Sequence, residues 1–293
     1  MKKRDIVKQL TEANPGLLAC PVCAEPMGMG QGYTLACANR HSFDVASTGY
    51  VNLLAKPGPS GYGAEMLESR LKVCRSGFFD TLLAEVAKTV AHWANGKRRA
   101  PTMLDAGCGE GSQLLRLTDS LRKSGMPEIT GIGVDISKDG IRIAAREYPG
   151  FLWLVADLAR LPVAAGSLDV VLNMLSPSNY GEFDRVLKED GLLVKVAPGE
   201  DYLKELRREF YAGGDKERYS NERVVCLFES SYHLLETKRI RQSFAVPEGL
   251  WPHIVAMTPL TWGAGEAERM KFLENSQGSV TLDFTLLAGK KKG

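Results

Sequence analysis

Three glycines within five residues separate a short apolar run from a helical pattern in this chain. They are Gly107, Gly109 and Gly111, and residues 102–104 followed by Asp105 come directly before them. A glycine-rich turn between a strand and a helix lets a ligand approach the backbone at the carboxyl end of the strand. The pattern therefore predicts a strand, a turn and a helix, with a ligand site at one edge of a sheet.

The region around this turn alternates apolar runs with helical patterns. We expect strands over 102–105, 129–136, 151–155, 168–175 and 192–197, with helices over 112–123, 138–148 and 182–187. Such alternation is typical of a parallel sheet built through crossover connections. Further along, strands over 232–246 and 280–288 indicate an antiparallel hairpin at the edge of the same sheet. The expected fold class is α/β, with a Rossmann-like seven-stranded sheet.

Acidic residues follow three successive predicted strands, at Asp105, Asp135 and Asp157. Asp105 would repel a pyrophosphate, and the turn lacks the two-residue gap of the dinucleotide motif. Asp105 can instead contact a cationic amino-acid group, while Asp135 can accept from two ribose hydroxyls and Asp157 from an adenine amino group. These acceptors fit S-adenosylmethionine better than NAD. The alternative is an ordinary α/β turn without a cofactor.

A second pattern near the N-terminus has the spacing of metal ligands. Cys20 and Cys23 are followed, after a short polar and glycine-containing loop, by Cys37 and His41. Two such pairs are typical of a closed tetrahedral zinc site. A segment of roughly 40 residues buries too little apolar surface to fold alone, and a bound metal can supply the missing stability. The alternative is four residues that are unrelated in space.

Composition limits the class of protein only broadly. The net charge of +2 does not by itself indicate a polyanionic partner, although basic runs such as 238–241 make nucleic acid plausible. No apolar run reaches the roughly 20 residues of a transmembrane helix. The first residues also lack the apolar stretch of a signal peptide, so we expect a cytoplasmic protein without a membrane partner. The six cysteines suit metal binding and free thiols in a reducing compartment.

The segment 104–111 together with Val134-Asp135 resembles class I S-adenosylmethionine-dependent methyltransferases. This resemblance covers roughly residues 64–288 and says little about the substrate. Additional features are similar to the RlmA family, whose members methylate N1 of a guanine in a hairpin of 23S ribosomal RNA. These features are the two ligand pairs, Ser42-Phe43-Asp44, residues 49–54, Ala64-Glu65-Met66, Met257-Thr258-Pro259 and Trp262.

The resemblance implies a division into a zinc-binding RNA-recognition module over 1–58 and a methyltransferase domain over 59–293. It also suggests a homodimer, and it implies that zinc is structural and that a 23S rRNA hairpin is the partner. Phe79 and Tyr202 are carried over from the family alone, since the family tends to have a cofactor-side aromatic residue and a histidine there. The residues expected to bind S-adenosylmethionine are Phe79, Asp105, Gly107, Gly109, Glu110, Gly111, Ser112, Asp135, Asp157 and Tyr202.

The acceptor side is less defined. Asn173 lies near the end of the fourth predicted strand, a position that faces the acceptor atom in many base methyltransferases. It is the catalytic candidate, through a hydrogen bond to the guanine edge. The sequence does not identify the base that removes the N1 proton; Glu182 or Asp184 could lie near the acceptor, or could simply be solvated helix residues. Two other functions stay open: a methyltransferase acting on a small molecule or a protein, and an RNA-binding protein that keeps the cofactor fold without turnover.

Overall fold

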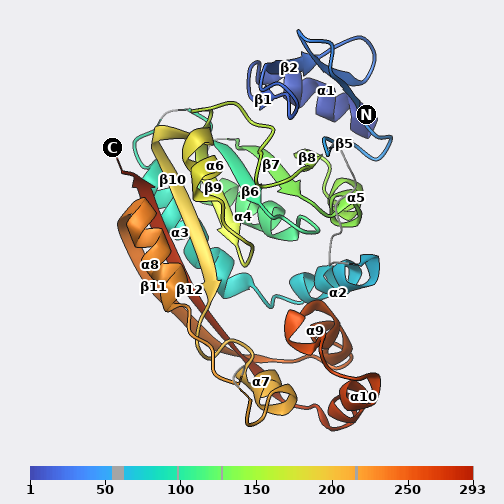
Figure 1. Ribbon diagram of the computed structural model, residues 1–293, viewed down its shortest axis with the longest axis vertical. Coiled ribbons are helices and arrows are strands. Elements are labelled where there is room, and N and C mark those ends of the chain that lie inside the picture. The colour runs from blue at the N-terminus through green and yellow to red at the C-terminus, as the bar shows by residue number, and fades with distance from the viewer. Residues whose placement is uncertain (55–62, 98, 127, 215–216, 293) are drawn as a thin grey trace.

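The computed structural model describes residues 1–54, 63–97, 99–126, 128–214 and 217–292. Its centre is an eight-stranded sheet in the order β11-β12-β10-β9-β6-β7-β8-β5 (Figure 1). The strands are β5 (Tyr50–Asn52), β6 (Thr102–Ala106), β7 (Thr130–Asp135), β8 (Leu152–Val155), β9 (Leu168–Met174), β10 (Leu187–Pro198), β11 (Tyr232–Ala245) and β12 (Ser279–Lys291).

The sheet matches the expected class I methyltransferase fold and has one additional strand. The strands from β10 through β9, β6, β7 and β8 are parallel, while β12 runs antiparallel to both β10 and β11. This confirms the seven strands and their antiparallel hairpin. The eighth strand, β5, pairs parallel to β8 at the far edge. It comes from the segment assigned to the zinc-binding module, so that segment contributes directly to the central sheet.

Successive residues of the central strands face two separate apolar layers, because side chains alternate along a strand. Met103 of β6 packs in the first of these layers, whereas Leu104 packs in the opposite one. The first layer contains α2 (Ala64–Arg75), α3 (Asp80–Ala94), α4 (Ser112–Lys123) and α5 (Lys138–Glu147). The opposite layer contains α6 (Tyr180–Val186), α8 (Glu222–Ser231) and the N-terminal segment. Both faces of the sheet are thus covered.

The N-terminal segment forms a small antiparallel sheet beside α1 (Lys3–Ala13), and we call it the zinc ribbon (residues 1–49). Its strands are β1 (Leu18–Ala19), β2 (Pro26–Met29), β3 (Thr34–Cys37) and β4 (Ser42–Asp44). Backbone hydrogen bonds join it to the segment after β8, from Ala19 to Pro162 at 3.1 Å and from Ala164 to Leu17 at 3.0 Å. The predicted boundary between residues 58 and 59 lies outside the described residues.

The segment between β11 and β12 packs against α2, the helix that also reaches the glycine turn. It contains α9 (Trp251–Met257), a short 3₁₀ helix (Pro259–Thr261) and α10 (Glu266–Asn275), while α7 (Lys204–Phe210) follows β10. Figure 1 shows α9 lying against α2. His253 of α9 is 3.2 Å from the Ser69 hydroxyl of α2. Within the described ranges, no helix is both long and apolar enough to cross a membrane.

Candidate functional site

The glycine turn connects β6 to α4 at the carboxyl edge of the sheet. Gly107 and Gly111 both have φ of +84°, a conformation that side chains with a Cβ rarely adopt. Neither glycine has room for a side chain, because a Cβ on Gly107 would lie 1.9 Å from Ser176 Oγ and one on Gly111 would lie 2.6 Å from Trp153. Larger residues therefore cannot replace these glycines, and the turn presents backbone to whatever binds beside it.

Asp135 ends β7 beside this turn. Its two carboxylate oxygens accept hydrogen bonds from the backbone of Gly109 and Ser137, both at 2.8 Å. Burial raises the pKa of Asp135, although the N–H groups of Ser137 and Gly109 and the charge of Arg70 oppose that effect. Each oxygen keeps a further lone pair. The carboxylate can thus accept from a diol while it stays held by the backbone.

Asp105 lies at the end of β6, with only 1% of its surface exposed. Its Oδ2 atom is buried and has no hydrogen-bond partner among the described residues. Burial raises the pKa of Asp105 to about 7, against the opposing positive charge of Arg70. Because an unpaired buried acceptor is costly, this oxygen fits a ligand that brings a cationic donor. The ammonium group of S-adenosylmethionine is such a donor.

Arg70 of α2 reaches the same turn and was not predicted from the sequence. Its Nε atom lies 3.8 Å from a Glu110 carboxylate oxygen, and its guanidinium carbon lies 5.6 Å from the centre of the Phe79 ring. Among the described residues, this long ion pair with Glu110 is the polar contact found for the guanidinium. The N–H groups of this guanidinium can bind the carboxylate of an amino-acid ligand, and the nearby Asp105 carboxyl can bind its ammonium group.

The two aromatic residues taken from the family resemblance both reach this cluster. Phe79 is buried and lies under Arg70, and Tyr202 follows β10. Both rings pack on Phe284 of β12, with centroid distances of 6.1 Å for Phe79 and 5.2 Å for Tyr202. Burial raises the pKa of Tyr202 to about 12, so its hydroxyl stays protonated. The two side chains thus form an apolar wall next to Arg70.

Glu110 and Ser112 face the start of α4. Glu110 is fully buried, and its carboxylate accepts from the Ser112 backbone at 3.1 Å and from the Ser112 hydroxyl at 2.7 Å. Both side chains therefore stabilise the first turn of α4. Asp157 differs, since it is exposed after β8 and accepts from the Ala159 backbone at 2.8 Å. A backbone hydrogen bond from Ala156 to Asp135 brings the ends of β8 and β7 together.

The acceptor-side hypotheses need correction. Asn173 is fully buried, and its amide already makes four hydrogen bonds, which is the full capacity of that group. It has no donor or acceptor left for a guanine edge. Glu182 accepts from the Leu161 backbone at 2.7 Å and pairs with Arg185 at 2.7 Å. Asn173 and Glu182 are thus engaged inside the protein, and sequence spacing could not reveal these partners.

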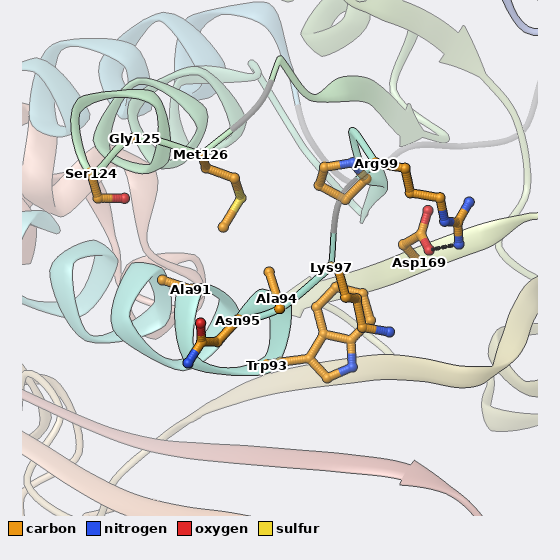
Figure 2. A pocket seen from close by; sticks show the side chains of 12 residues that line it. Ala91, Trp93, Ala94, Asn95, Lys97, Arg99, Ser124, Gly125, Met126 and Asp169 are labelled. Atoms are coloured by element: carbon orange, nitrogen blue, oxygen red, sulfur yellow. Dashed lines mark hydrogen bonds and ion pairs between the residues drawn. The ribbon is translucent and has the colours of Figure 1, made fainter.

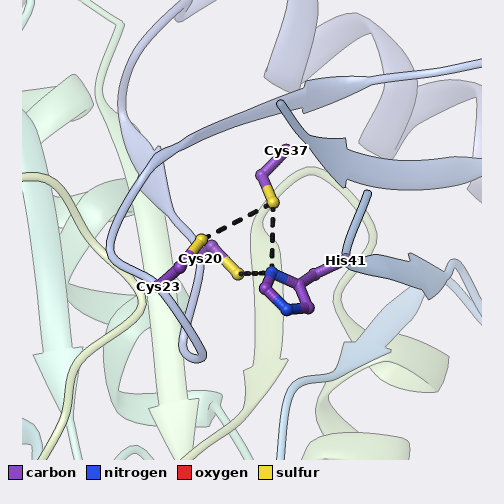
Figure 3. A group of neighbouring side chains, drawn as sticks. All are labelled: Cys20, Cys23, Cys37 and His41. Carbon is purple, nitrogen blue, oxygen red and sulfur yellow. Dashed lines mark hydrogen bonds between the residues drawn. The ribbon is translucent and has the colours of Figure 1, made fainter. Parts of the chain in front are cut away.

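The zinc quartet converges to one point, as Figure 3 shows. The Sγ atoms of Cys23 and Cys37 are 3.7 Å apart, and His41 Nδ1 lies 3.4 Å from Cys37 Sγ and 3.6 Å from Cys20 Sγ. Zinc–sulfur and zinc–nitrogen bonds of about 2.3 Å and 2.0 Å separate tetrahedral ligands by about 3.7 Å and 3.5 Å respectively. The observed spacing therefore fits a tetrahedral zinc ion.

Short turns build both ligand pairs. The Ala24 backbone donates to Cys20 O at 2.8 Å, and the Arg40 backbone donates to Cys37 O at 3.0 Å. Ala24 and Arg40 both have φ of +64°, which folds each turn tightly. The pKa of the Cys23 thiol is lowered to about 6, mainly by a hydrogen bond from the backbone N–H of Glu25. This favours the thiolate, which is the form that binds zinc.

Comparisons with known proteins match both the N-terminal segment and the segment that contains the glycine turn. The profile of the RlmA N-terminal zinc ribbon matches residues 18–56, and that of a methyltransferase domain matches residues 103–191. The chain is 39% identical to the Bacillus subtilis protein named "Putative 23S rRNA (guanine-N(1)-)-methyltransferase YxjB", over 94% of this chain and 97% of that protein. It is 31% identical to a 23S rRNA (guanine(748)-N(1))-methyltransferase of Streptomyces fradiae, over 92% and 94% of the two chains.

The chain belongs to the RlmA family. It is a methyltransferase that uses S-adenosylmethionine and has a structural zinc site. A malonyl-[acyl-carrier protein] O-methyltransferase of a Methylovorus species is also similar, at 36% identity, but over only 36% of this chain and 39% of that enzyme. The RlmA relatives therefore account for much more of the chain.

A pocket lies at the edge of the sheet opposite the glycine turn, near the amino ends of β6 and β9 (Figure 2). Its charged side chains are already engaged, because Arg99 pairs with Asp169 and Lys97 lies 4.0 Å from the centre of the Trp93 ring. It contains none of the predicted site residues. The glycine turn and the zinc quartet therefore remain the two candidate sites of this family member.

Proposed function

We propose that this protein transfers a methyl group from S-adenosylmethionine to N1 of a guanine in a hairpin of 23S ribosomal RNA. The carrying observation is the similarity to two proteins of that name over more than nine-tenths of this chain. That similarity extends across the zinc ribbon as well as the methyltransferase domain. A homodimer and a cytoplasmic location remain predictions that accompany this function.

In this proposal, the glycine turn and its neighbours hold the methyl donor. Asp135 accepts from the ribose hydroxyls and Asp157 from the adenine amino group. Asp105 and Arg70 bind the ammonium and the carboxylate of the amino-acid end, since one offers an unpaired acceptor and the other the N–H donors of its guanidinium. Gly107, Gly109, Gly111 and Ser112 supply the backbone at the turn, and Phe79 and Tyr202 form the apolar wall.

The bound donor supplies an activated methyl group on a sulfonium, so the protein's contribution is mainly to position the acceptor in line with it. The zinc ribbon supports RNA as the acceptor, because it is a second folded surface next to β5, and β5 pairs with β8, the neighbour of the strand that ends in Asp135. Guanine N1 carries a proton at neutral pH. Transfer to it requires that this proton leave as the methyl group arrives.

The proposal is tested with purified protein, labelled S-adenosylmethionine and 23S rRNA from a strain that lacks this modification. We expect label in the RNA and a primer-extension stop at one guanine, since methylation at N1 blocks base pairing. Fully modified 23S rRNA is the matched control and should take up little label. Transfer to no RNA would refute the proposed acceptor, while transfer of the label to a small molecule would support the rival methyltransferase function.

A further inference from the structure

Lys195 in β10 is buried, with 5% of its surface exposed. Its Nζ atom donates to Asn173 Oδ1 and to the Ser176 carbonyl oxygen, both at 2.6 Å. No acid pairs with it in the described part of the chain, whereas Lys188 on the same strand pairs with Asp169 at 2.8 Å. Burial lowers the pKa of Lys195 to about 8. An amine buried without an acid is costly, so packing alone does not explain a lysine here.

The two acceptors of Lys195 hold the segment that follows β9, and we call residues 175–178 the β9 loop. Leu175 in this loop has φ of +55°, a conformation that leucine disfavours. Its backbone N–H donates to Val196 O at 3.0 Å, next to Lys195 in β10. A disfavoured backbone persists only where its neighbours hold it in place. The β9 loop therefore depends on contacts from β10.

The same loop touches the glycine turn. Asn173 Nδ2 donates to Ala106 O, just before Gly107, and to Pro177 O in the loop, both at 3.0 Å. Ser176 is so close to Gly107 that a Cβ there would lie 1.9 Å from its hydroxyl oxygen. Lys195 thus fixes one side of the β9 loop through Asn173 and Ser176, and the other side meets the turn that is proposed to hold the donor.

We propose that Lys195 is a positioning residue for methyl transfer, which holds the β9 loop against Gly107 so that the acceptor base meets the donor methyl group in line. The inference rests on the proposed function for the identity of the acceptor, but not for the contacts of the loop. A displacement of about 1 Å in such a geometry can reduce the rate ~100-fold. Lys195 acts through Asn173 and Ser176 and not by touching the reacting atoms.

The test compares the full-length variants Lys195→Met, Lys195→Arg and Lys188→Met with the wild type. Methionine keeps the length of the side chain but cannot donate, whereas arginine can still donate to two acceptors. Lys188→Met is the matched control, because it removes a lysine from the same strand far from the β9 loop. The measurements are kcat and KM with undermethylated 23S rRNA, the Kd of S-adenosylhomocysteine, the melting temperature and amide hydrogen exchange of residues 170–180.

For Lys195→Met we expect kcat to fall about 10- to 100-fold, with KM and the Kd of S-adenosylhomocysteine within about threefold of wild type. Lys195→Arg should recover part of the loss, and only the Lys195 variants should exchange faster in the β9 loop. A kcat within threefold of wild type would overturn the inference. A parallel loss of kcat, ligand affinity and melting temperature would also overturn it, because that pattern indicates a purely structural role.

Failure of the proposed function gives a different pattern. If the wild type transfers no methyl group to rRNA, the acceptor assignment fails, and the exchange measurement alone decides the role of Lys195. Faster exchange of the β9 loop in Lys195→Met, with Lys188→Met unchanged, would still support the positioning role. Unchanged exchange in both variants would overturn it.

Discussion

The zinc ribbon and the glycine-turn site differ in how their side chains are brought together. The four ligands of the ribbon lie within 22 consecutive residues, Cys20 to His41, and their spacing follows from two short turns. The glycine-turn site instead collects Arg70 from α2, Asp105 from β6 and Tyr202 from the segment after β10. A local site can be read from spacing, whereas a site built from distant elements depends on how those elements pack.

The two regions also differ in what stabilises them. The ribbon has short strands and a small core, so a bound zinc ion supplies much of its stability. The methyltransferase sheet is buried on both faces by helices and by the ribbon itself, so it has a large apolar core of its own. Strand β5 and the Ala19–Pro162 hydrogen bond join the two regions. Loss of zinc should therefore affect the ribbon strongly and the cofactor site weakly.

The largest expected effect is the loss of zinc in Cys37→Ser. Zinc content should fall from about one ion per chain to a small fraction, because three ligands cannot close a structural site. The melting temperature should also fall, while the Kd of S-adenosylhomocysteine should rise less than about tenfold. Metal analysis and calorimetry check these outcomes. Cys226→Ser, at an exposed cysteine, is the matched control and should keep its zinc.

Unchanged zinc content in Cys37→Ser would refute the ligand assignment. If Cys37→Ser lost all binding of S-adenosylhomocysteine along with its zinc, the expectation that the cofactor site is stable without the ribbon would be refuted. It would mean that the ribbon shapes the cofactor site through β5 and the segment after β8.

A second, intermediate effect is expected for Arg70→Met. Charge-assisted hydrogen bonds are worth about 1.5–3 kcal/mol, so the Kd of S-adenosylhomocysteine should rise roughly 10- to 100-fold. The Kd of 5′-methylthioadenosine, which lacks the amino-acid carboxylate, should change less than about threefold. Calorimetry with both ligands measures the difference. Arg75→Met removes an arginine of the same helix that pairs with Glu147 at the surface, and serves as the control.

Equal losses for the two ligands would contradict the assignment of Arg70 to the carboxylate. They would show that Arg70 stabilises the turn as a whole, through Glu110 and the Phe79 ring.

The same contrast explains how much the sequence could predict. Acidic residues at strand ends and glycines in a turn have local patterns, so Asp105, Asp135 and the parallel strands were predictable. Arg70 and Lys195 have no such pattern, because each becomes a site residue only after a distant segment packs over the turn. The Asn173 hypothesis was wrong for this reason, since its partner Lys195 lies 22 positions away. Strand β5 was missed because three residues are too short for a periodic pattern.

The smallest expected effect is a change in proton uptake at Asp105. In the free protein its pKa is about 7, so about half of the carboxyl groups are protonated at pH 7. An unfolded aspartate has a pKa near 3.8. The native state therefore binds more protons than the unfolded state between about pH 4 and pH 7, and the ligand-free protein should lose stability as the pH rises through that range.

A bound ammonium group favours the charged carboxylate and lowers its pKa. Binding of S-adenosylhomocysteine at pH 7 should thus release about half a proton per site, and affinity should increase as the pH rises from 6 to 8. Calorimetry in two buffers of different ionisation enthalpy measures this release. Asp105→Asn should bind more weakly and release fewer protons, while 5′-methylthioadenosine, which has no ammonium, should release almost none from the wild type. Equal proton release with S-adenosylhomocysteine and 5′-methylthioadenosine would show that the ammonium group lies away from Asp105. The ammonium would then not be the partner of the buried Asp105 Oδ2 atom.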